Sequence, residues 1–173
     1  IQNYLADQIT VPRFSTELPE FAEAEKAVQA RIDHLMGIKG KKSVDSIHKE
    51  LGHIMWEYVG MGRTEEGLKT ALKLLKDIRK EFETNLFIPG STEGVNIELE
   101  KALRLNDFIT MGELIAYDAL NRNESCGGHF REEYQTEEGE AKRDDENYFY
   151  VSCWEYQGSD DVAPVLYKEP LVY

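Results

Sequence analysis

Residues able to carry ionic or acid–base chemistry gather in the stretch Leu120–Asn147, around two adjacent glycines. Gly127 and Gly128 permit positive φ angles and a close approach to another surface, because neither has a Cβ. The stretch follows an apolar helical pattern, and cations suit the partial negative charge at a helix C-terminus. We expect an exposed loop that points donors such as His129 and Arg131 at a partner, together with the remaining charged residues Glu124, Arg143, Asp144 and Asp145.

The residues of the same stretch do not indicate a specific catalytic or metal site. Glu124 and His129 could form a general acid–base pair, but such a pair needs an orienting partner and a pocket that the sequence does not reveal. Cys126 lies where the end of a helix disfavours a thiolate. The adjacent carboxylates of Asp144 and Asp145 are typical of a solvated acidic loop. A glycine-stopped helix followed by a solvated loop therefore stays open beside the partner-binding interpretation.

One motif elsewhere has the spacing of metal ligands. Glu50-x-x-His53 resembles half of a carboxylate-bridged di-iron site, which needs two such motifs and a Glu from each of two further helices. No second Glu-x-x-His lies on a predicted bundle helix, and His34 and His48 are single histidines. We therefore expect no metal.

Composition excludes several classes of function. The 173 residues fit one domain, and the formal charge of −13 argues against a nucleic-acid backbone or an anionic membrane as partner. No apolar run approaches the roughly 20 residues that span a bilayer. Cys126 and Cys153 show no metal or redox spacing, which favours a reduced compartment. Because the first residue is Ile1, we expect a piece of a longer protein.

Four stretches carry the three- and four-residue apolar spacing of amphipathic helices, namely Pro19–Met36, Ser43–Tyr58, Thr64–Phe82 and Ile97–Asn121. Short loops between them favour antiparallel neighbours. The fourth helix is apolar on more than one face, so we expect it to be central, with the other three packed against it.

The predicted fold is mainly α, an antiparallel bundle of three to four helices resembling a spectrin repeat. Two short strands, Tyr148–Tyr156 and Val165–Tyr167, should follow the charged stretch, joined by a turn at Gly158–Asp161. Residues 1–18 read as an extended arm from an upstream domain, interrupted by Pro12. Residues 19–122 form the bundle, and residues 123–173 complete the same domain.

Two passages resemble a known family. The run RNESCGGHFREEY at residues 122–134, followed by RDDEN at 143–147, resembles the signature R-x-E-S-R-G-x-H-x-R-x-D-Y-P…R-D-D-x-x-W. That signature belongs to the C-terminal domain of the succinate dehydrogenase and fumarate reductase flavoprotein subunit, and L-aspartate oxidase shares it in outline. The run MWEYVGMGRTEEGL at residues 55–68 is similar to that domain's M-W-x-x-V-G-x-x-R-x-x-x-x-L passage.

The resemblance implies a helical domain docked on a flavin domain that interconverts succinate and fumarate through covalently held FAD, within electron transport and the tricarboxylic acid cycle. The FAD-binding and catalytic residues of that family precede this chain, so neither cofactor nor catalytic residue is expected in it. The implied partners are the upstream FAD domain and an iron-sulfur subunit, in a cytoplasmic complex peripheral to the membrane. The residues implied to face the flavin domain are Glu124, Gly127, Gly128, His129, Arg131, Arg143 and Asp144.

The chain departs from the family pattern at several positions. Cys126, Glu133 and Gln135 replace the usual Arg, Asp and Pro, Tyr148 replaces Trp, and an acidic insertion precedes Arg143. Loss of the Arg removes a fork of donors suited to a carboxylate. The alternative interpretation is a free-standing acidic helical module that binds a protein partner through its Gly127-Gly128 loop.

Overall fold

The computed structural model describes residues 1–8, 15–159 and 162–172. Its helices are α1 (Gln2–Gln8), α2 (Pro19–Gly37), α3 (Val44–Val59), α4 (Glu65–Asn85), α5 (Ile97–Asn121) and α6 (Asp145–Tyr148). Its strands are β1 (Lys42–Ser43), β2 (Leu86–Phe87), β3 (Tyr150–Glu155) and β4 (Val165–Pro170). The mainly helical fold with a C-terminal pair of strands is confirmed.

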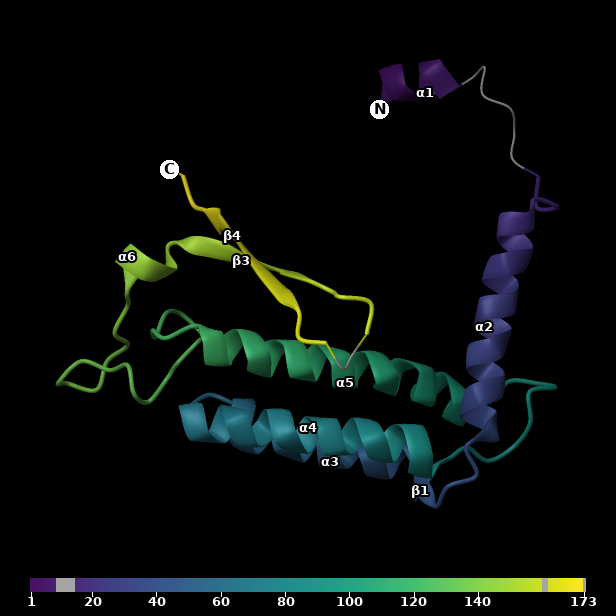
Figure 1. The fold of residues 1–173 in the computed structure, drawn as a ribbon, viewed down its shortest axis with the longest axis horizontal. Helices are drawn as coiled ribbons and strands as arrows, with labels where there is room; N and C mark the ends of the chain where they lie inside the picture. Colours follow the sequence, from purple (N-terminus) through teal and green to yellow (C-terminus); the bar gives the residue numbers. More distant parts are fainter. Residues whose placement is uncertain (9–14, 160–161, 173) are drawn as a thin grey trace.

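Helices α3, α4 and α5 lie side by side and enclose the core (Figure 1). Each contributes fully buried aliphatic side chains, including Ile47, Leu68, Leu75, Leu105 and Ile109. One polar link crosses this core, where Arg79 of α4 donates to both carboxylate oxygens of Glu113 on α5, at 3.2 and 2.7 Å. Both side chains are shielded from water, so the pair fixes how α4 sits against α5.

Side-chain caps set the starts of the three core helices. Ser43 Oγ accepts from the amide of Ser46 at 3.2 Å, and Thr64 Oγ1 accepts from the amide of Gly67 at 3.0 Å. Asn96 Oδ1 accepts from the amide of Leu99 at 3.0 Å. These bonds satisfy amides that have no partner within the first turn, and they fix where each core helix begins.

A short parallel pairing of β1 with β2 closes the end of the bundle, and the sequence did not predict it. Gly40 makes the pairing possible, since a Cβ there would lie 2.0 Å from the carbonyl of Asn85. Two-residue strands are too short to leave a periodic pattern in a sequence.

Helix α2 does not pack along the bundle as expected. Leu35 is its one buried residue, while Phe21 and Val28 are at least half exposed. Near its C-terminal end, Arg31 reaches the carbonyl of Leu103 at 3.2 Å and the carboxylate of Asp107 at 3.5 Å. Figure 1 shows α2 projecting from the end of the bundle, with its C-terminal part near α5 and α1 beyond its N-terminal end.

Two further expectations change at the N-terminus and along α5. The arm predicted as extended contains helix α1, while Pro12 lies outside the described residues. The fourth predicted helix, α5, contacts α2, α3 and α4, as a central helix should. Its apolar residues are not all covered, however, because Phe108, Met111 and Ile115 remain about half exposed.

Strands β3 and β4 form an antiparallel hairpin that crosses over α5 (Figure 1). Trp154 anchors it, donating from Nε1 to Asp118 Oδ1 at 2.7 Å and meeting the Tyr117 ring edge-on at 5.4 Å between centroids. The two predicted strands are confirmed. Of the predicted turn, Gly158 has a positive φ of 82°, and residues 160–161 lie outside the described part of the chain.

Candidate functional site

The signature segment, residues 122–134, folds back against the turn between α3 and α4. The amide of Arg63 donates to the carbonyl of Phe130 at 3.1 Å, and the amide of Glu132 donates to the carbonyl of Arg63 at 2.8 Å. Within the segment, Cys126 and His129 exchange backbone hydrogen bonds of 2.8 and 3.1 Å around a tight turn. Gly127 has a φ of 58° in that turn, a left-handed conformation that favours glycine.

Arg131 is completely buried and joins the ends of two helices. Its Nη1 donates to the carbonyls of Ala119 at 3.0 Å and Leu120 at 3.4 Å, which lie in the last turn of α5. A guanidinium there satisfies carbonyls that lack a partner within the helix and matches the negative end of the helix dipole. The Nε of Arg131 donates to Glu133 Oε2 at 3.1 Å.

Glu133 extends this connection to the start of α4. Its Oε1 accepts from the amide of Glu65 at 2.5 Å, at the positive end of that helix. Burial alone would raise the pKa of Glu133. Hydrogen bonds from the Glu65 amide, from its own amide and from Arg131 outweigh that effect and lower the pKa. The pair Arg131–Glu133 therefore ties the C-terminus of α5 to the N-terminus of α4.

Glu124 and Ser125 are also buried, at 2% and 0% exposure. Glu124 accepts from Arg122 Nε at 2.9 Å and from the amide of Asp144 at 2.8 Å, which joins the segment to the chain entering α6. Ser125 Oγ accepts from the amide of Arg131 at 2.8 Å and donates to its carbonyl at 3.1 Å. Both side chains form these hydrogen bonds with residues of this domain.

His129 lies between three arginines. Its Nδ1 faces Arg63 Nη1 at 2.9 Å, and its Nε2 faces the carbonyl of Arg122 at 2.9 Å. Because a guanidinium only donates, Nδ1 accepts and the ring proton sits on Nε2. Burial lowers the pKa of His129, and the positive charges of Arg63, Arg131 and Arg122 lower it further, although the bond to the Arg122 carbonyl opposes this. His129 is accordingly a neutral bridge rather than a cation.

These positions correct the expectation of an exposed loop. The side chains of Glu124 and Arg131 are buried, and His129 is half-buried and aimed at Arg63. The turn around Gly127 and Gly128 does reach solvent, as does Arg143, which pairs with Asp145 at 2.6 Å. Glu124 and His129 do not pair directly, since one binds the side chain of Arg122 and the other its carbonyl.

Arg63 is the partner that sequence reasoning missed. Its guanidinium donates from Nε to the carbonyls of Val59 at 3.2 Å and Gly60 at 3.0 Å, besides meeting His129. Burial lowers the pKa of Arg63, and the charge of Asp118 opposes that change. The signal was present, because Arg63 and His129 occupy marked positions in the two family-like passages, but nothing in the sequence paired them.

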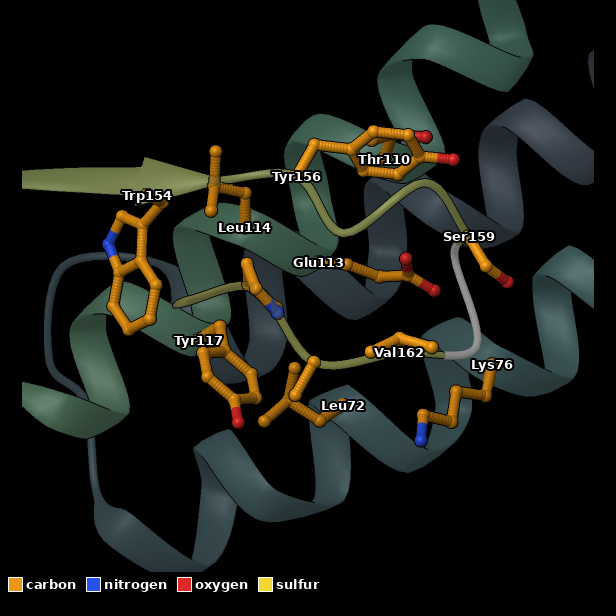
Figure 2. Close-up of a pocket in the computed structure, with 12 residues that line it drawn as sticks. Leu72, Lys76, Thr110, Glu113, Leu114, Tyr117, Trp154, Tyr156, Ser159 and Val162 are labelled. Carbon is orange, nitrogen blue, oxygen red and sulfur yellow. The ribbon is translucent and has the colours of Figure 1, made fainter. Parts of the chain in front are cut away.

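Two hollows flank α5. One, of about 320 Å³, opens beside the signature segment and is lined by Arg63, Asp118, Arg122 and His129 among others. The second, of about 330 Å³, lies between α4, α5 and the hairpin connection, with Trp154 and Tyr117 towards one end and Lys76 towards the other (Figure 2). Its lining is mostly apolar, and the carboxylate of Glu113 within it is already bound by Arg79.

The N-termini of α3, α4 and α5 do not fit the pyrophosphate of a dinucleotide such as FAD. Such a group is held by free amides at a glycine-rich helix N-terminus. Here the caps of α3, α4 and α5 are their own side chains, and each first turn carries an acidic residue, such as Asp45, Glu65 or Glu98. These three helix ends therefore offer no site for a dinucleotide.

Metal ligands and membrane spans are also not formed by the described residues. Glu50 accepts from Lys42 at 2.7 Å, which gives half of the Glu-x-x-His motif a structural role. No group of three or more His, Cys, Asp or Glu side chains in residues 1–8, 15–159 and 162–172 could hold a metal ion. Within the same residues, no helix combines the length and apolar character needed to cross a bilayer.

The fold and the segment define a helical domain in which two family-like passages, 55–68 and 122–134, are hydrogen-bonded to each other. The model of the family described as fumarate reductase flavoprotein C-term matches residues 48–173. The chain belongs to this family, the C-terminal domain shared by the flavoproteins of succinate dehydrogenase, fumarate reductase and L-aspartate oxidase.

Three relatives illustrate the range of the family. An uncharacterized FAD-dependent oxidoreductase of Methanocaldococcus jannaschii is 31% identical over 112 residues, 65% of this chain and 20% of its own length. The fumarate reductase flavoprotein subunit of Proteus vulgaris is 29% identical over 148 residues, 83% of this chain and 24% of its own. A chloroplastic L-aspartate oxidase of Nicotiana tabacum is 37% identical over 88 residues, 51% of this chain and 13% of its own.

A solved structure shows the same fold. Mycobacterium smegmatis Sdh1 in complex with UQ1 superposes with a TM-score of 0.77 at 24% identity, over 98% of this chain and 26% of that one. The chain thus spans between 13% and 26% of the length of the proteins named here.

Proposed function

We propose that this chain is the C-terminal helical domain of a flavoprotein subunit that interconverts succinate and fumarate, and that it docks on the FAD domain of the same polypeptide. The match of the fumarate reductase flavoprotein C-terminal model to residues 48–173 carries the proposal. Similarity to a fumarate reductase subunit over 83% of the chain supports it. Hydride transfer belongs to the FAD domain, and we assign no step of it to residues of this chain.

The signature residues divide into two roles in this proposal. Glu124 and Arg131 are buried, so they act by positioning the segment. The turn at Gly127 and Gly128 reaches solvent, and a Cβ at either glycine would meet no atom of this domain. Space that the domain leaves empty at these glycines suits the close approach of another surface.

The remaining docking residues act at the edge of the segment. His129 holds the turn in place through Arg63 and the carbonyl of Arg122. Arg143 is exposed and Asp144 half-buried, which suits contact with the FAD domain.

A second candidate function is oxidation of L-aspartate. The tobacco L-aspartate oxidase has the highest identity of the three relatives named above, although over a shorter stretch. Both substrate classes are dicarboxylates, and the residues that would distinguish them lie outside this chain in our proposal. A free-standing acidic interaction module is the third possibility, and it predicts a gene without an upstream nucleotide-binding domain.

Partners and location follow from the same proposal. We expect an iron-sulfur subunit to accept electrons from the flavoprotein, in a complex peripheral to the cytoplasmic face of the membrane. The naming of the Proteus vulgaris relative as a flavoprotein subunit supports the expectation of a multi-subunit enzyme.

Steady-state kinetics of the purified full-length gene product tests the proposal. Three assays are needed: succinate with a dye acceptor, fumarate with reduced viologen, and L-aspartate with oxygen. We expect turnover with succinate or fumarate. Turnover with L-aspartate alone would select the second candidate, and a full-length product with no flavin would overturn both.

A further inference from the structure

We infer that one face of the bundle, built by α3 and α5, is covered in the full-length protein by the nucleotide-binding part of the same polypeptide. The inference rests on the proposed function and names the surface that docks. The α3/α5 face comprises Gly52, Met55 and Trp56 on α3 and Phe108, Met111 and Ile115 on α5.

Four large apolar side chains of this face are exposed. Trp56 is 82% exposed, Met111 52%, Phe108 45% and Ile115 43%. Two contacts fix the register of the helices beneath it. The rings of His48 and Phe108 stack at 5.4 Å, and Met55 lies beside Gly112. The exposed residues therefore line one side of a packed helix pair, and clustered apolar exposure of this kind marks an interaction site.

Gly52 is a separate observation on the same face. A glycine inside a helix is less stable than alanine, so its presence needs a reason. Gly112 has one inside the domain, since a Cβ there would lie 3.2 Å from the sulfur of Met55. Gly52 has none, because a Cβ there would meet nothing within 4 Å. A position without a side chain, one helical turn before the exposed Trp56, allows a neighbouring backbone to come close.

The position of the face identifies what covers it. The same side of α5 continues at helical spacing from Phe108, Met111 and Ile115 to the half-buried Asp118 and then to Arg122 beyond the helix. Asp118 and Arg122 line the opening beside the signature segment, so the apolar face is continuous with the proposed docking edge.

The length of the relatives indicates which part of the protein covers the face. The chain spans 20% and 24% of two relatives, and the matching family model is a C-terminal one. Most of such a protein therefore lies outside this chain. Because that larger part is covalently linked to this domain, its effective concentration at the α3/α5 face is higher than that of any separate protein.

Hydroxyl-radical footprinting of the unsubstituted full-length protein tests the inference without any variant. Trp56 and Met111 should be oxidised at least fivefold more slowly in the native protein than after unfolding in urea. Tyr156, which is 63% exposed on the hairpin, is the matched control and should change less than twofold. Equal protection factors for Trp56 and Tyr156 would overturn the inference. Protection that disappears on dilution would also overturn it, because a second copy would then be the occupant.

Two variants of the full-length protein supply an independent measurement. Trp56→Asp should speed release of the upstream domain in limited proteolysis at least threefold, while Tyr156→Asp should not. Equal proteolysis of the two variants would overturn the inference. Both sites are exposed within this domain, so circular dichroism should show unchanged helix content. A protein that protects Trp56 but turns over no dicarboxylate would refute the proposed function and leave the docking face standing.

Discussion

Replacing Arg131 by alanine removes the side chain that joins α5 to α4. Arg131 is 0% exposed and donates to two carbonyls at the end of α5 and to Glu133, which itself accepts from the amide of Glu65 at the start of α4. An exposed loop, as the sequence suggested, would lose nothing from this change and would keep its melting temperature. The buried position predicts a large loss of stability instead.

The magnitude follows from three contributions. Hydrogen bonds from a charged donor to the buried carbonyls are worth about 1.5–3 kcal/mol. Alanine keeps Cβ, so the change removes two buried methylenes, Cγ and Cδ, which contribute about 1.6 kcal/mol at roughly 0.8 kcal/mol each. Glu133 keeps 39% of its side chain exposed, so the ion pair adds about 1 kcal/mol at most. We therefore expect Arg131→Ala to lower the free energy of unfolding by about 3–5.5 kcal/mol, the sum of these contributions.

Urea denaturation followed by circular dichroism at the helix band measures this loss. Arg131→Lys keeps the charge and most of the stem but loses the fork of donors, so it should cost less, about 1–3 kcal/mol. Arg143→Ala is the matched control, because that arginine is 56% exposed and pairs only at the surface, which predicts a change within about 1 kcal/mol. A loss below about 1 kcal/mol for Arg131→Ala would refute the structural role that we assign to the signature segment.

Four further outcomes can be checked on the same chain. Ile109→Ala should cost about 2–5 kcal/mol in urea denaturation, whereas Ile115→Ala, on the exposed side of α5, should cost less than about 1 kcal/mol; equal costs would mean that the core is misassigned. His129→Gln should flatten the pH dependence of stability. The lowered pKa of His129 means that the unfolded chain binds the proton more readily, so its contribution is complete above about pH 6.5 and is lost as the pH falls below that value. An unchanged slope between pH 7 and 5 would contradict the neutral bridge. Gly40→Ala should lower the free energy of unfolding by about 1–3 kcal/mol, because its Cβ would lie 2.0 Å from a backbone carbonyl. Gly37→Ala is the control and should be neutral or slightly stabilising, because the space around Gly37 is open. The reverse order would refute the tight β1–β2 junction. Calorimetric titration of this chain with FAD, succinate or fumarate should give no heat of binding, because each core helix N-terminus is capped by its own side chain, and saturable micromolar binding would refute this.

The sequence by itself determined helices α2 to α5, the starts of the three core helices and most of the residues that line the core. Apolar residues at three- and four-residue spacing identify α3, α4 and α5 because that spacing is a direct consequence of helical geometry. Ser43, Thr64 and Asn96 mark helix starts through bonds that span three residues. Information of this kind is local, so it can be read from the order of residues.

Tertiary structure alone decided which way the signature residues point. From the sequence, Arg131 is expected to be a solvent-exposed cation beside the glycines. In the structure it is buried and donates to the carbonyl of Ala119. His129 finds Arg63, 66 positions earlier, and Glu124 finds the amide of Asp144, 20 positions later. Hydrogen bonds between such distant residues impose no period on the sequence. Charged side chains are also ordinarily solvated, so their burial becomes visible only when the chain supplies every partner at once.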